Sequence, residues 1–533
     1  MVAVHREVEK KYAADEAFEL PPLTGLVPGI DGRRRTGDGG ATPIAEGEVV
    51  RQKLSATYFD TADLRLALAG LTLRRRTGGD DAGWHLKVPA GKDARSEVRL
   101  PLGRGARTVP TRLQQMVWAR TLGAALRPVA EIVTGRSVRR LVDATGHVVA
   151  EIADDRVTAR RLLPLNGSGD AAGAAVSWRE IEVEVDDEAP DLLDAVDARL
   201  RERGLEEAAG ASKLAHVLDL DRRGATEAPM ATKLTVGSTG GEVVLAHIRE
   251  QVEQVQAQDL PVRLDAPDAV HKMRVATRRL RSALTTFKPL FAADVVRPLR
   301  DELRWLAGEL GAARDAEVMR DRVRKAVEAD PEVPESGSVA EDAAAELGQA
   351  YRTAHDRVLA ELDGERYHGI LLALDGLVTS PPYTDRAAAP AATALPPRVK
   401  WSFARVRRLV EEADATPAGA EREELLHDAR KAAKQARYAG ESVSRVFGAS
   451  ATAFAEVMED VQEALGEHQD SVLTRERLRE LALHTSSTAA AFLYGRLHAL
   501  EEARAQETQQ HFDAAWRAAR RKSLHRWLRK APR

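Results

Sequence analysis

The spacing of apolar residues divides the chain into two parts. Over residues 1–220, short runs alternate between apolar and charged positions, as in "REVEKKY", "LTLRRR" and "SWREIEVEV", and Gly- and Asp-rich segments separate these runs. A period of two predicts antiparallel strands of a sheet or barrel. One helix is expected from Pro190 to Gly204. From residue 242 onward, nearly every segment has the Ala, Leu, Arg and Glu content of helices.

Four segments show neither period, and their Gly, Pro, Ala or Thr content predicts loops or linkers. They are residues 29–48, 166–175, 222–241 and 380–397. We therefore predict a β-rich domain at 1–220, a linker at 221–241 and a helical domain at 242–533. The Pro/Ala-rich segment divides the helical domain into repeats at about 242–379 and 398–525.

Two segments of the helical part repeat one another. "HKMRVATRRLR" begins at His271, and "HDARKAAKQAR" begins at His427. Phe291 and Phe447 each lie 20 positions after their histidine. "LGAARD" then matches "LGEHQD" at offsets that differ by one residue. These landmarks indicate an internal repeat of roughly 150 residues.

The repeated segment carries cations on one face of its predicted helix, because positions i, i+3, i+7 and i+10 share a face. The residues at these positions are His271, Arg274, Arg278 and Arg281 in the first repeat, and His427, Arg430, Lys434 and Arg437 in the second. Like charges one turn apart cost about 0.2–0.5 kcal/mol per pair. We therefore expect both faces to bind a flexible polyanion, with a structural role as the alternative for the two histidines.

Composition narrows the ligand class and the compartment. The net charge is −3 and only 4% of the residues are aromatic, so neither general nucleic-acid binding nor base stacking is expected. The chain has no cysteine, which excludes disulfides and thiolate metal sites. It has no apolar run near the roughly 20 residues of a membrane span, and its first residues lack an apolar signal segment. We expect a soluble cytoplasmic protein.

Like charges also gather on single faces of the predicted strands, because side chains alternate with period two. The rows are Glu7, Glu9 and Lys11; Arg74 and Arg76; and Glu180, Glu182 and Glu184. On an open sheet such rows repel, whereas in a closed barrel acidic and basic rows line a lumen and face each other. Carboxylates bind Mg²⁺ or Mn²⁺, and Arg and Lys bind phosphate oxygens. The pattern favours a metal-bound, highly anionic ligand.

The first part of the chain resembles CYTH domains, the triphosphate tunnel metalloenzymes, over roughly residues 3–220. "EVEKK" matches their ExExK motif, and "LTLRRR", "WHLK", "RSE", "EIADD", "REIEVEVD" and "SKLAHVL" follow in the family's order. The helical part resembles the CHAD domain, a polyphosphate binder. The resemblance implies an α+β domain built on an eight-stranded antiparallel β-barrel tunnel, followed by an all-α domain of two four-helix repeats. It also implies metal-dependent hydrolysis of triphosphate-containing substrates.

The resemblance assigns roles to residues of this chain. The metal ligands would be Glu7, Glu9, Glu182 and Glu184, and the ion would be Mg²⁺ or Mn²⁺. The residues that clamp phosphates would be Arg74, Arg76, Lys87, Arg136 and Lys213, with Arg139 and Arg140 as alternatives to Arg136. Catalysis would involve Glu7, Glu9 and Lys11, together with Glu151 and Asp155 on the opposing strand.

Two functions from different classes fit these features. The first is an enzyme that cleaves inorganic triphosphate, polyphosphate or another triphosphate, with the helical domain binding inorganic polyphosphate. The second is a non-catalytic protein that binds polyphosphate and targets polyphosphate granules, with a vestigial tunnel. The retained acidic and basic rows favour the enzyme, and the residues 29–48 are expected to cover a tunnel mouth.

Overall fold

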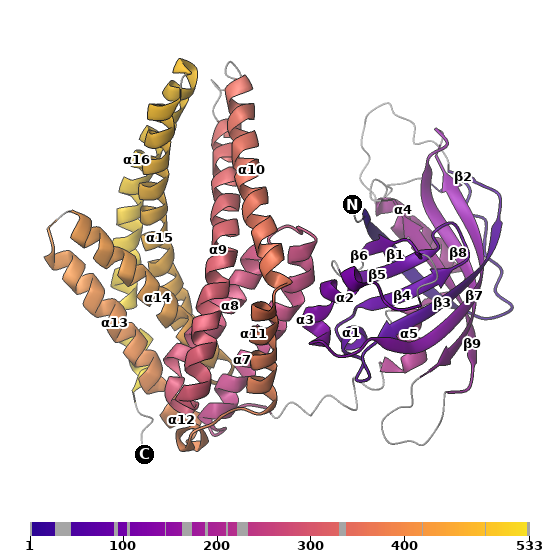
Figure 1. Ribbon diagram of the computed structural model, residues 1–533, viewed down its shortest axis with the longest axis horizontal. Coiled ribbons are helices and arrows are strands. Elements are labelled where there is room, and N and C mark those ends of the chain that lie inside the picture. Colours follow the sequence, from indigo (N-terminus) through magenta and orange to yellow (C-terminus); the bar gives the residue numbers. More distant parts are fainter. Residues whose placement is uncertain are drawn as a thin grey trace. The chain divides into compact units, whose positions relative to one another are not determined.

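The chain forms two compact units, Met1–Met230 and Ala231–Arg533 (Figure 1). The structure, a computed structural model, describes residues 3–26, 44–89, 94–103, 107–143, 145–162, 173–186, 190–208, 212–220, 233–329, 337–417, 419–485 and 487–529. Most of the predicted loops 29–48 and 166–175 lies outside these residues, as do residues 221–232 of the predicted linker.

The described residues of the first unit form eight long strands and two short ones. The long strands are β1 (Ala3–Ala14), β3 (Val50–Asp60), β4 (Thr72–Thr77), β5 (Gly83–Pro89), β6 (Ala94–Leu100), β7 (Arg127–Val142), β8 (Val148–Arg161) and β9 (Val176–Val185). The short ones are β2 (Ala45–Glu46) and β10 (Glu206–Glu207). Strand β2 corrects the prediction of a loop through residue 48: these two residues pair with Leu141 and Val142 of β7.

The strand pairings run in a ring. The order is β1-β6-β5-β4-β3-β7-β8-β9, and all pairs are antiparallel. Strand β1 pairs with β6 through Ala3–Val8 and with β9 through Val8–Ala14, so the order returns to its first strand. The predicted combination of an antiparallel β domain with a helical domain is confirmed.

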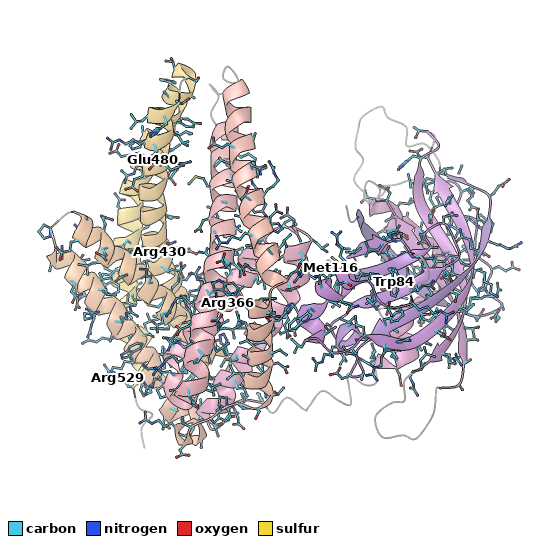
Figure 2. All side chains as sticks on the ribbon, in the orientation of Figure 1. Trp84, Met116, Arg366, Arg430, Glu480 and Arg529 are labelled. Atoms are coloured by element: carbon cyan, nitrogen blue, oxygen red, sulfur yellow. The ribbon has the colours of Figure 1, made fainter. Side chains whose placement is uncertain are left out.

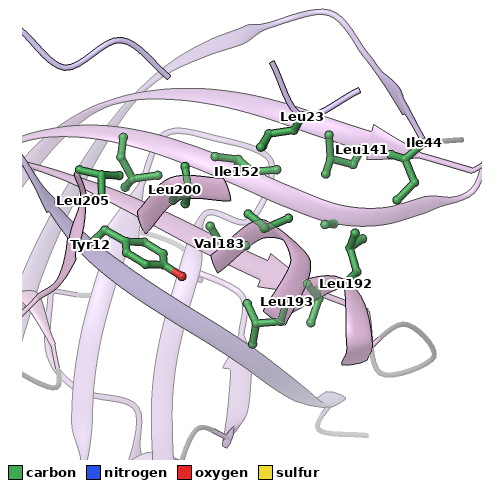
Figure 3. Close-up of a cluster of buried hydrophobic side chains, with 14 residues drawn as sticks. Tyr12, Leu23, Ile44, Leu141, Ile152, Val183, Leu192, Leu193, Leu200 and Leu205 are labelled. Carbon is green, nitrogen blue, oxygen red and sulfur yellow. The ribbon is translucent and has the colours of Figure 1, made fainter. Parts of the chain in front are cut away.

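Apolar side chains cover the outside of one wall of the barrel (Figure 3). Tyr12 of β1 and Val183 of β9 are fully buried against Leu192 and Leu200 of α4 (Pro190–Glu202). The Tyr12 hydroxyl donates a 2.7 Å hydrogen bond to Asp197 of the same helix. Because outward positions on these strands are apolar, the alternate charged positions face the interior.

Helix α5 (Lys213–Leu218) packs against strands β3, β7 and β8 of the barrel. Its Leu214 and Leu218 belong to the same apolar cluster as Ala56, Tyr58 and Ile132, which line the interior. The helix begins at its first lysine because the Ser212 hydroxyl caps it, accepting a hydrogen bond from a backbone N–H of the first turn. The other short helices of this unit are α1 (Arg65–Leu68), α2 (Thr111–Met116) and α3 (Trp118–Thr121).

The second unit is helical. Its helices are α7 (Gly240–Arg263), α8 (Ala269–Thr286), α9 (Ala293–Ala329), α10 (Gly337–Leu362), α11 (Glu365–Thr379), α12 (Ala391–Ala394), α13 (Pro396–Ala415), α14 (Ala420–Phe447), α15 (Ala449–His484) and α16 (Thr488–Ala519), with 3₁₀ turns η1 (Lys288–Leu290), η3 (Asp385–Ala388) and η4 (Lys522–Leu528). Helix α7 begins inside the predicted linker, where Thr239 and Glu242 form a capping box.

The two repeats place equivalent landmarks on equivalent helices. The histidine segments form the starts or middles of α8 and α14, and the Gly-containing segments lie in the long helices α9 and α15. Helices α7 to α10 thus correspond to α13 to α16. The first repeat has an additional helix, α11, whose Tyr367, Ile370 and Leu374 are buried.

Candidate functional site

The barrel encloses a charged cavity of about 400 Å³. Its charged lining residues are Glu9, Lys11, Arg74, Arg76, Asp80, Asp81, Lys87, Glu97, Arg99, Arg136, Arg140, Glu151, Glu182, Glu184 and Lys213. In the ring of eight long strands, β4 lies opposite β9, and β5 lies opposite β8. The basic wall therefore stands opposite the acidic wall across the cavity.

Three carboxylates form a row across neighbouring strands of the acidic wall. Glu184 of β9 pairs in register with Glu9 of β1 on one side and with Glu151 of β8 on the other. Strand β8 is thus a direct neighbour of β9 and does not oppose it, which corrects the expectation for Glu151 and Asp155. The Glu151 side chain is 41% exposed and accepts a 2.7 Å hydrogen bond from Arg140, so this row lies toward an open end.

A second, deeper group of carboxylates surrounds the ammonium group of Lys213. Its Nζ lies 2.9 Å from Asp155, 2.7 Å from Glu180 and 2.7 Å from Glu182. Arg136 also holds Asp155, through hydrogen bonds of 2.8 and 2.6 Å. Asp155 is fully buried, so its carboxylate orients two cations and does not face a water-filled space.

The ionisation of this deeper group follows from its charges. Burial alone would raise the pKa of Glu182, but Lys11, Lys213 and Arg136 hold the pKa of this carboxyl well below its usual range. Lys11 contacts it at 2.8 Å. Burial alone would lower the pKa of Lys213, but Glu182 and Asp155 raise it. Both partners therefore stay charged at neutral pH.

Two groups of carboxylates could bind a divalent cation, and they differ in the cations that already surround them. Asp155, Glu180 and Glu182 lie close enough together to share an ion. Lys213 already sits among all three, so a metal ion would have to displace its ammonium group. The outer row of Glu9, Glu184 and Glu151 offers the oxygen donors that Mg²⁺ and Mn²⁺ prefer and lies nearer the opening. Lys11 lies 3.3 Å from Glu9 and Arg140 lies 2.7 Å from Glu151, but no single ammonium group sits among all three outer carboxylates as Lys213 does in the deeper group. The outer row therefore fits a metal better than the deeper group. The side chain of Glu7 lies outside the described residues.

On the basic wall, Glu97 of β6 compensates only part of the positive charge. It is fully buried and lies 3.6 Å from Arg74, 3.9 Å from Lys87 and 2.9 Å from His85 Nδ1. Burial would raise the pKa of Glu97, but the hydrogen bond from His85 and the charges of Lys87 and Arg74 lower it strongly.

Arg76 lies next to this group and shows the crowding of positive charge. Its guanidinium pairs with Asp81, and its side chain is almost fully buried. Burial first, and then the neighbouring Arg74 and Arg136, lower its pKa. Such a site gains free energy when an anion enters, because the anion relieves the repulsion between desolvated cations.

Sequence reasoning missed Glu97 and His85. The segments "WHLK" and "RSE" contain them, and period two places His85 on the face of Lys87. Only the pairing of β5 with β6 brings His85 and Glu97 together, and that pairing cannot be read from either segment.

The side chains of the three candidate arginines of β7 point in different directions. Arg136 points into the cavity, Arg140 lies at its rim with Glu151, and Arg139 turns away to Glu46 of β2 at 3.0 Å. The predicted cavity residues Glu9, Lys11, Arg74, Arg76, Lys87, Arg136, Glu151, Glu182, Glu184 and Lys213 all line one space.

In the helical unit, the basic face of α8 is largely uncompensated. Arg274 lies 3.6 Å from the exposed Asp315 of α9. Within the part of the chain that the structure describes, Arg278 and Arg281 have no carboxylate at ion-pair distance. Burial first, and then Arg278, lower the pKa of Arg281. Burial and the nearby Arg314 lower the pKa of His271, so this imidazole is neutral at pH 7.

The arginines on the basic face of α14 differ in what surrounds their guanidinium groups. Arg437 is held by carboxylates, at 2.7 Å from Glu441 and 2.7 Å from Glu459 of α15. Arg430, labelled in Figure 2, instead lies against Gly466 of α15, where an added Cβ would be only 2.9–3.3 Å from the guanidinium. Arg437 therefore fits a structural ion-pair network better than a ligand face. Among the described groups, His427 Nδ1 is buried without a hydrogen-bond partner.

The glycine of each repeat explains why "LG" recurs. Gly311 of α9 faces Arg274, with 3.4–3.7 Å between an added Cβ and the guanidinium, as Gly466 faces Arg430. In both repeats, the absence of a side chain leaves room for the arginine on the neighbouring helix.

Tyr438 of α14 lies between a cation of α8 and a cation of α14. The guanidinium groups of Arg279 and Arg437 lie 5.8 and 5.7 Å from its ring centroid. Arg279 also pairs with Glu441 at 2.9 Å, which ties α8 to α14. The position equivalent to Tyr438 in the first repeat is Ser282, so this contact belongs to the junction between the repeats.

No helix in the described part of the chain is long and apolar enough to cross a membrane.

Comparison with known proteins finds two families in this chain. Residues 44–216 match the CYTH domain, and residues 246–479 match the CHAD domain. An uncharacterized protein of Mycobacterium tuberculosis is 36% identical over 531 residues, which cover 97% of this chain and 96% of that protein. Among solved structures, PptA from Streptomyces chartreusis is 21% identical with a TM-score of 0.44, covering 52% of this chain and 100% of its own. The CHAD domain from the plant Ricinus communis is 25% identical with a TM-score of 0.44, covering 55% of this chain and 96% of its own.

Proposed function

This chain belongs to the proteins in which a CYTH domain is followed by a CHAD domain, and we propose that its barrel hydrolyses inorganic triphosphate, polyphosphate or a related triphosphate while its helical unit binds polyphosphate. The observation that carries the proposal is the cavity with a basic wall opposite an acidic wall. Phosphoryl transfer requires little covalent help from a protein and depends on positioning and on neutralising charge.

The residues of the barrel divide this work. Arg74, Arg76 and Lys87 of β4 and β5 would bind the phosphate oxygens, because Glu97 compensates only part of their charge. Lys11 would reach the substrate from the acidic wall. Arg136 and Lys213 hold the deeper carboxylates and so keep the floor of the cavity near neutral.

The outer row of Glu9, Glu184 and Glu151 would hold a divalent cation near the opening, whereas Glu182 is already held by Lys11, Lys213 and Arg136. A bound Mg²⁺ or Mn²⁺ would neutralise phosphate oxygens and lower the pKa of a water molecule. These residues themselves would orient the substrate so that its terminal phosphate lies toward the open end.

The helical unit would hold a longer polyanion. Arg278 and Arg281 of α8 have no carboxylate at ion-pair distance among the described residues, and Arg281 lies close enough to Tyr438 of α14 for the two groups to interact electrostatically. Bound phosphates would release counterions from both partners, so the affinity should fall steeply with salt. Association with polyphosphate granules would follow from such binding.

One observation favours the alternative of a non-catalytic polyphosphate-binding protein with a vestigial tunnel. The deeper carboxylates are already neutralised by Lys213 and Arg136, which leaves fewer ligands for a metal. The test is phosphate release from tripolyphosphate, thiamine triphosphate and ATP with Mg²⁺ or Mn²⁺. We expect turnover by the wild type and its loss in Glu9→Gln, which keeps size but removes a carboxylate. Release from none of these substrates would leave only the binding function.

A further inference from the structure

A second cavity, of about 680 Å³, lies in the helical unit at the junction of η1, α9 and η3. Its lining residues are Lys288, Pro289, Phe291, Ala293, Val296, Arg297, Arg300, Thr384, Asp385 and Arg386. This volume falls in the range of about 300–1,000 Å³ that is typical of small-molecule sites. None of the roles assigned above uses this space.

The cavity has a rigid frame. The turn before α9 pairs with the segment after α11: Thr384 N–H donates to the Leu290 carbonyl at 3.0 Å, and the Thr384 hydroxyl donates to the Pro289 carbonyl at 2.7 Å. The rings of Phe291 and Tyr383 lie 5.7 Å apart. The cavity is therefore preformed and needs little ordering to accept a ligand.

The charge of the lining is one-sided. Lys288, Arg297, Arg300 and Arg386 are cations, and within the described residues none of them has a carboxylate at ion-pair distance. Asp385 is the single acidic residue of the lining. Arg300 Nε is buried without a hydrogen-bond partner among the described groups. Lys288, Arg297 and Arg386 are exposed and Arg300 is half-buried, so four cations without a described ion-pair partner line this space, which favours an anionic ligand.

The internal repeat provides an independent observation. The core of α9 matches that of α15 at a constant offset, with Leu303 equivalent to Met458 and Leu310 to Leu465, all buried. At the same offset, Arg297 corresponds to Thr452 and Arg300 to Ala455.

Lys288, in the turn before α9, corresponds to Ser444 at the offset of the phenylalanine landmarks. The second repeat thus builds the same helices without these three cations. The charges of the first repeat are not required by the fold.

The rest of the lining is apolar. Phe291 and Val296 are buried, and Pro289 and Ala293 complete the wall. Inorganic polyphosphate has no apolar atoms to cover such a wall, whereas an organic phosphate has both a charged and an apolar end. We propose that this cavity binds a small phosphate monoester of nucleotide size, with its phosphate on Arg297, Arg300 and Arg386 and its organic group against Phe291 and Val296.

The site borders the polyphosphate face, because Arg300 lies close enough to Arg281 to lower its pKa. The test therefore uses Arg297 and Arg386. Both side chains are exposed and have no ion pair among the described residues, so Arg297→Ala and Arg386→Ala should not change the melting temperature. Lys400→Ala, an exposed cation on α13, is the matched control.

The probe is AMP, titrated calorimetrically into the full chain in EDTA, with adenosine and inorganic phosphate as the two half-ligands. We expect AMP to bind at least about tenfold tighter than either half-ligand, and each arginine variant to weaken it about tenfold, since each removes a charge-assisted hydrogen bond. Lys400→Ala should leave the affinity unchanged.

Three results would overturn the inference. They are AMP binding that survives the double variant, inorganic phosphate or tripolyphosphate binding this cavity as tightly as AMP, and AMP binding that is lost in Arg74→Ala and so belongs to the tunnel. The inference does not rest on polyphosphate binding, because Arg278→Ala should weaken polyphosphate binding and leave the affinity for AMP unchanged.

Discussion

Replacing Lys213 by methionine should destabilise the barrel and change the way its stability depends on pH. The Lys213 Nζ lies 2.7–2.9 Å from the carboxylates of Asp155, Glu180 and Glu182, and its side chain is 9% exposed. Methionine nearly keeps the length of the side chain but has no charge. The variant therefore leaves three buried carboxylates with less positive charge than they have in the wild type.

The size of the effect can be worked from these contacts. Removing one partner of a buried ion pair costs about 3–5 kcal/mol. Because Arg136 remains on Asp155 and Glu182, we expect the lower end, about 3 kcal/mol. For a unit of this size, 1 kcal/mol shifts the melting temperature by about 2–4 °C, so the midpoint should fall by about 6–12 °C.

The direction of the pH dependence follows from the pKa shifts. In the wild type, the lowered pKa of Glu182 contributes stability that is present above its ordinary value of 4.5 and is lost as the pH falls through the folded-state value. The raised pKa of Lys213 contributes stability that is present below its ordinary value of 10.5 and is lost as the pH rises above it. In the variant, a carboxylate without its cation has a raised pKa, so acidification from pH 8 to pH 5 should restore part of the lost stability.

The assay is thermal melting of the full chain, followed by circular dichroism between pH 5 and pH 8. Lys10→Met is the control, because Lys10 pairs with Asp194 and Asp197 on the outside of the barrel at 3.4 and 3.5 Å. Its effect should stay within about 1 kcal/mol. A Lys213→Met variant that melts like the wild type, or that loses stability on acidification, would refute the reasoning.

Further predictions concern the helical unit. Arg278→Ala should weaken polyphosphate binding and flatten its salt dependence without loss of stability. Arg437→Ala should instead lower the melting temperature, because it leaves Glu441 and Glu459 without this cation. Equal melting temperatures of the two variants would contradict the distinction. Gly466→Ala should weaken polyphosphate binding, because the new methyl group displaces the Arg430 guanidinium, and Gly311→Ala should have a smaller effect, because its clearance is larger. A titration of polyphosphate across a salt series measures the affinity of each variant. A larger loss of affinity for Gly311→Ala than for Gly466→Ala would contradict the prediction for the glycines.

Period two along the strands predicts most of the tunnel. The alternation of Glu9 with Lys11, and of Arg74 with Arg76, places each pair on one face, and a ring of strands turns these faces toward one cavity. The repeated helices could likewise be predicted, because matching residues recur at fixed offsets. The spacing of residues predicts the direction of a side chain wherever that direction depends only on the strand or helix that carries it.

The remaining features depend on contacts between distant segments. The partnership of His85 with Glu97 requires the pairing of two strands, and Arg437 forms an ion pair with Glu459 because α15 supplies that carboxylate. Lys213 reaches the acidic wall from α5, so it balances carboxylates as well as facing the cavity. No spacing within a single segment encodes these neighbours. They could not be predicted from the sequence.

The most direct test of the proposed function compares one arginine inside the tunnel with one outside it. The initial rate of phosphate release from tripolyphosphate with Mg²⁺ would be measured for the wild type, for Arg74→Ala on the cavity wall and for Arg139→Ala, whose side chain turns to Glu46. The account predicts a fall in kcat/KM of about 10²–10³-fold for Arg74→Ala, the loss typical of one preorganised charge-stabilising donor, and a change of less than about twofold for Arg139→Ala. Equal rates for the two variants, or no release by the wild type, would contradict it.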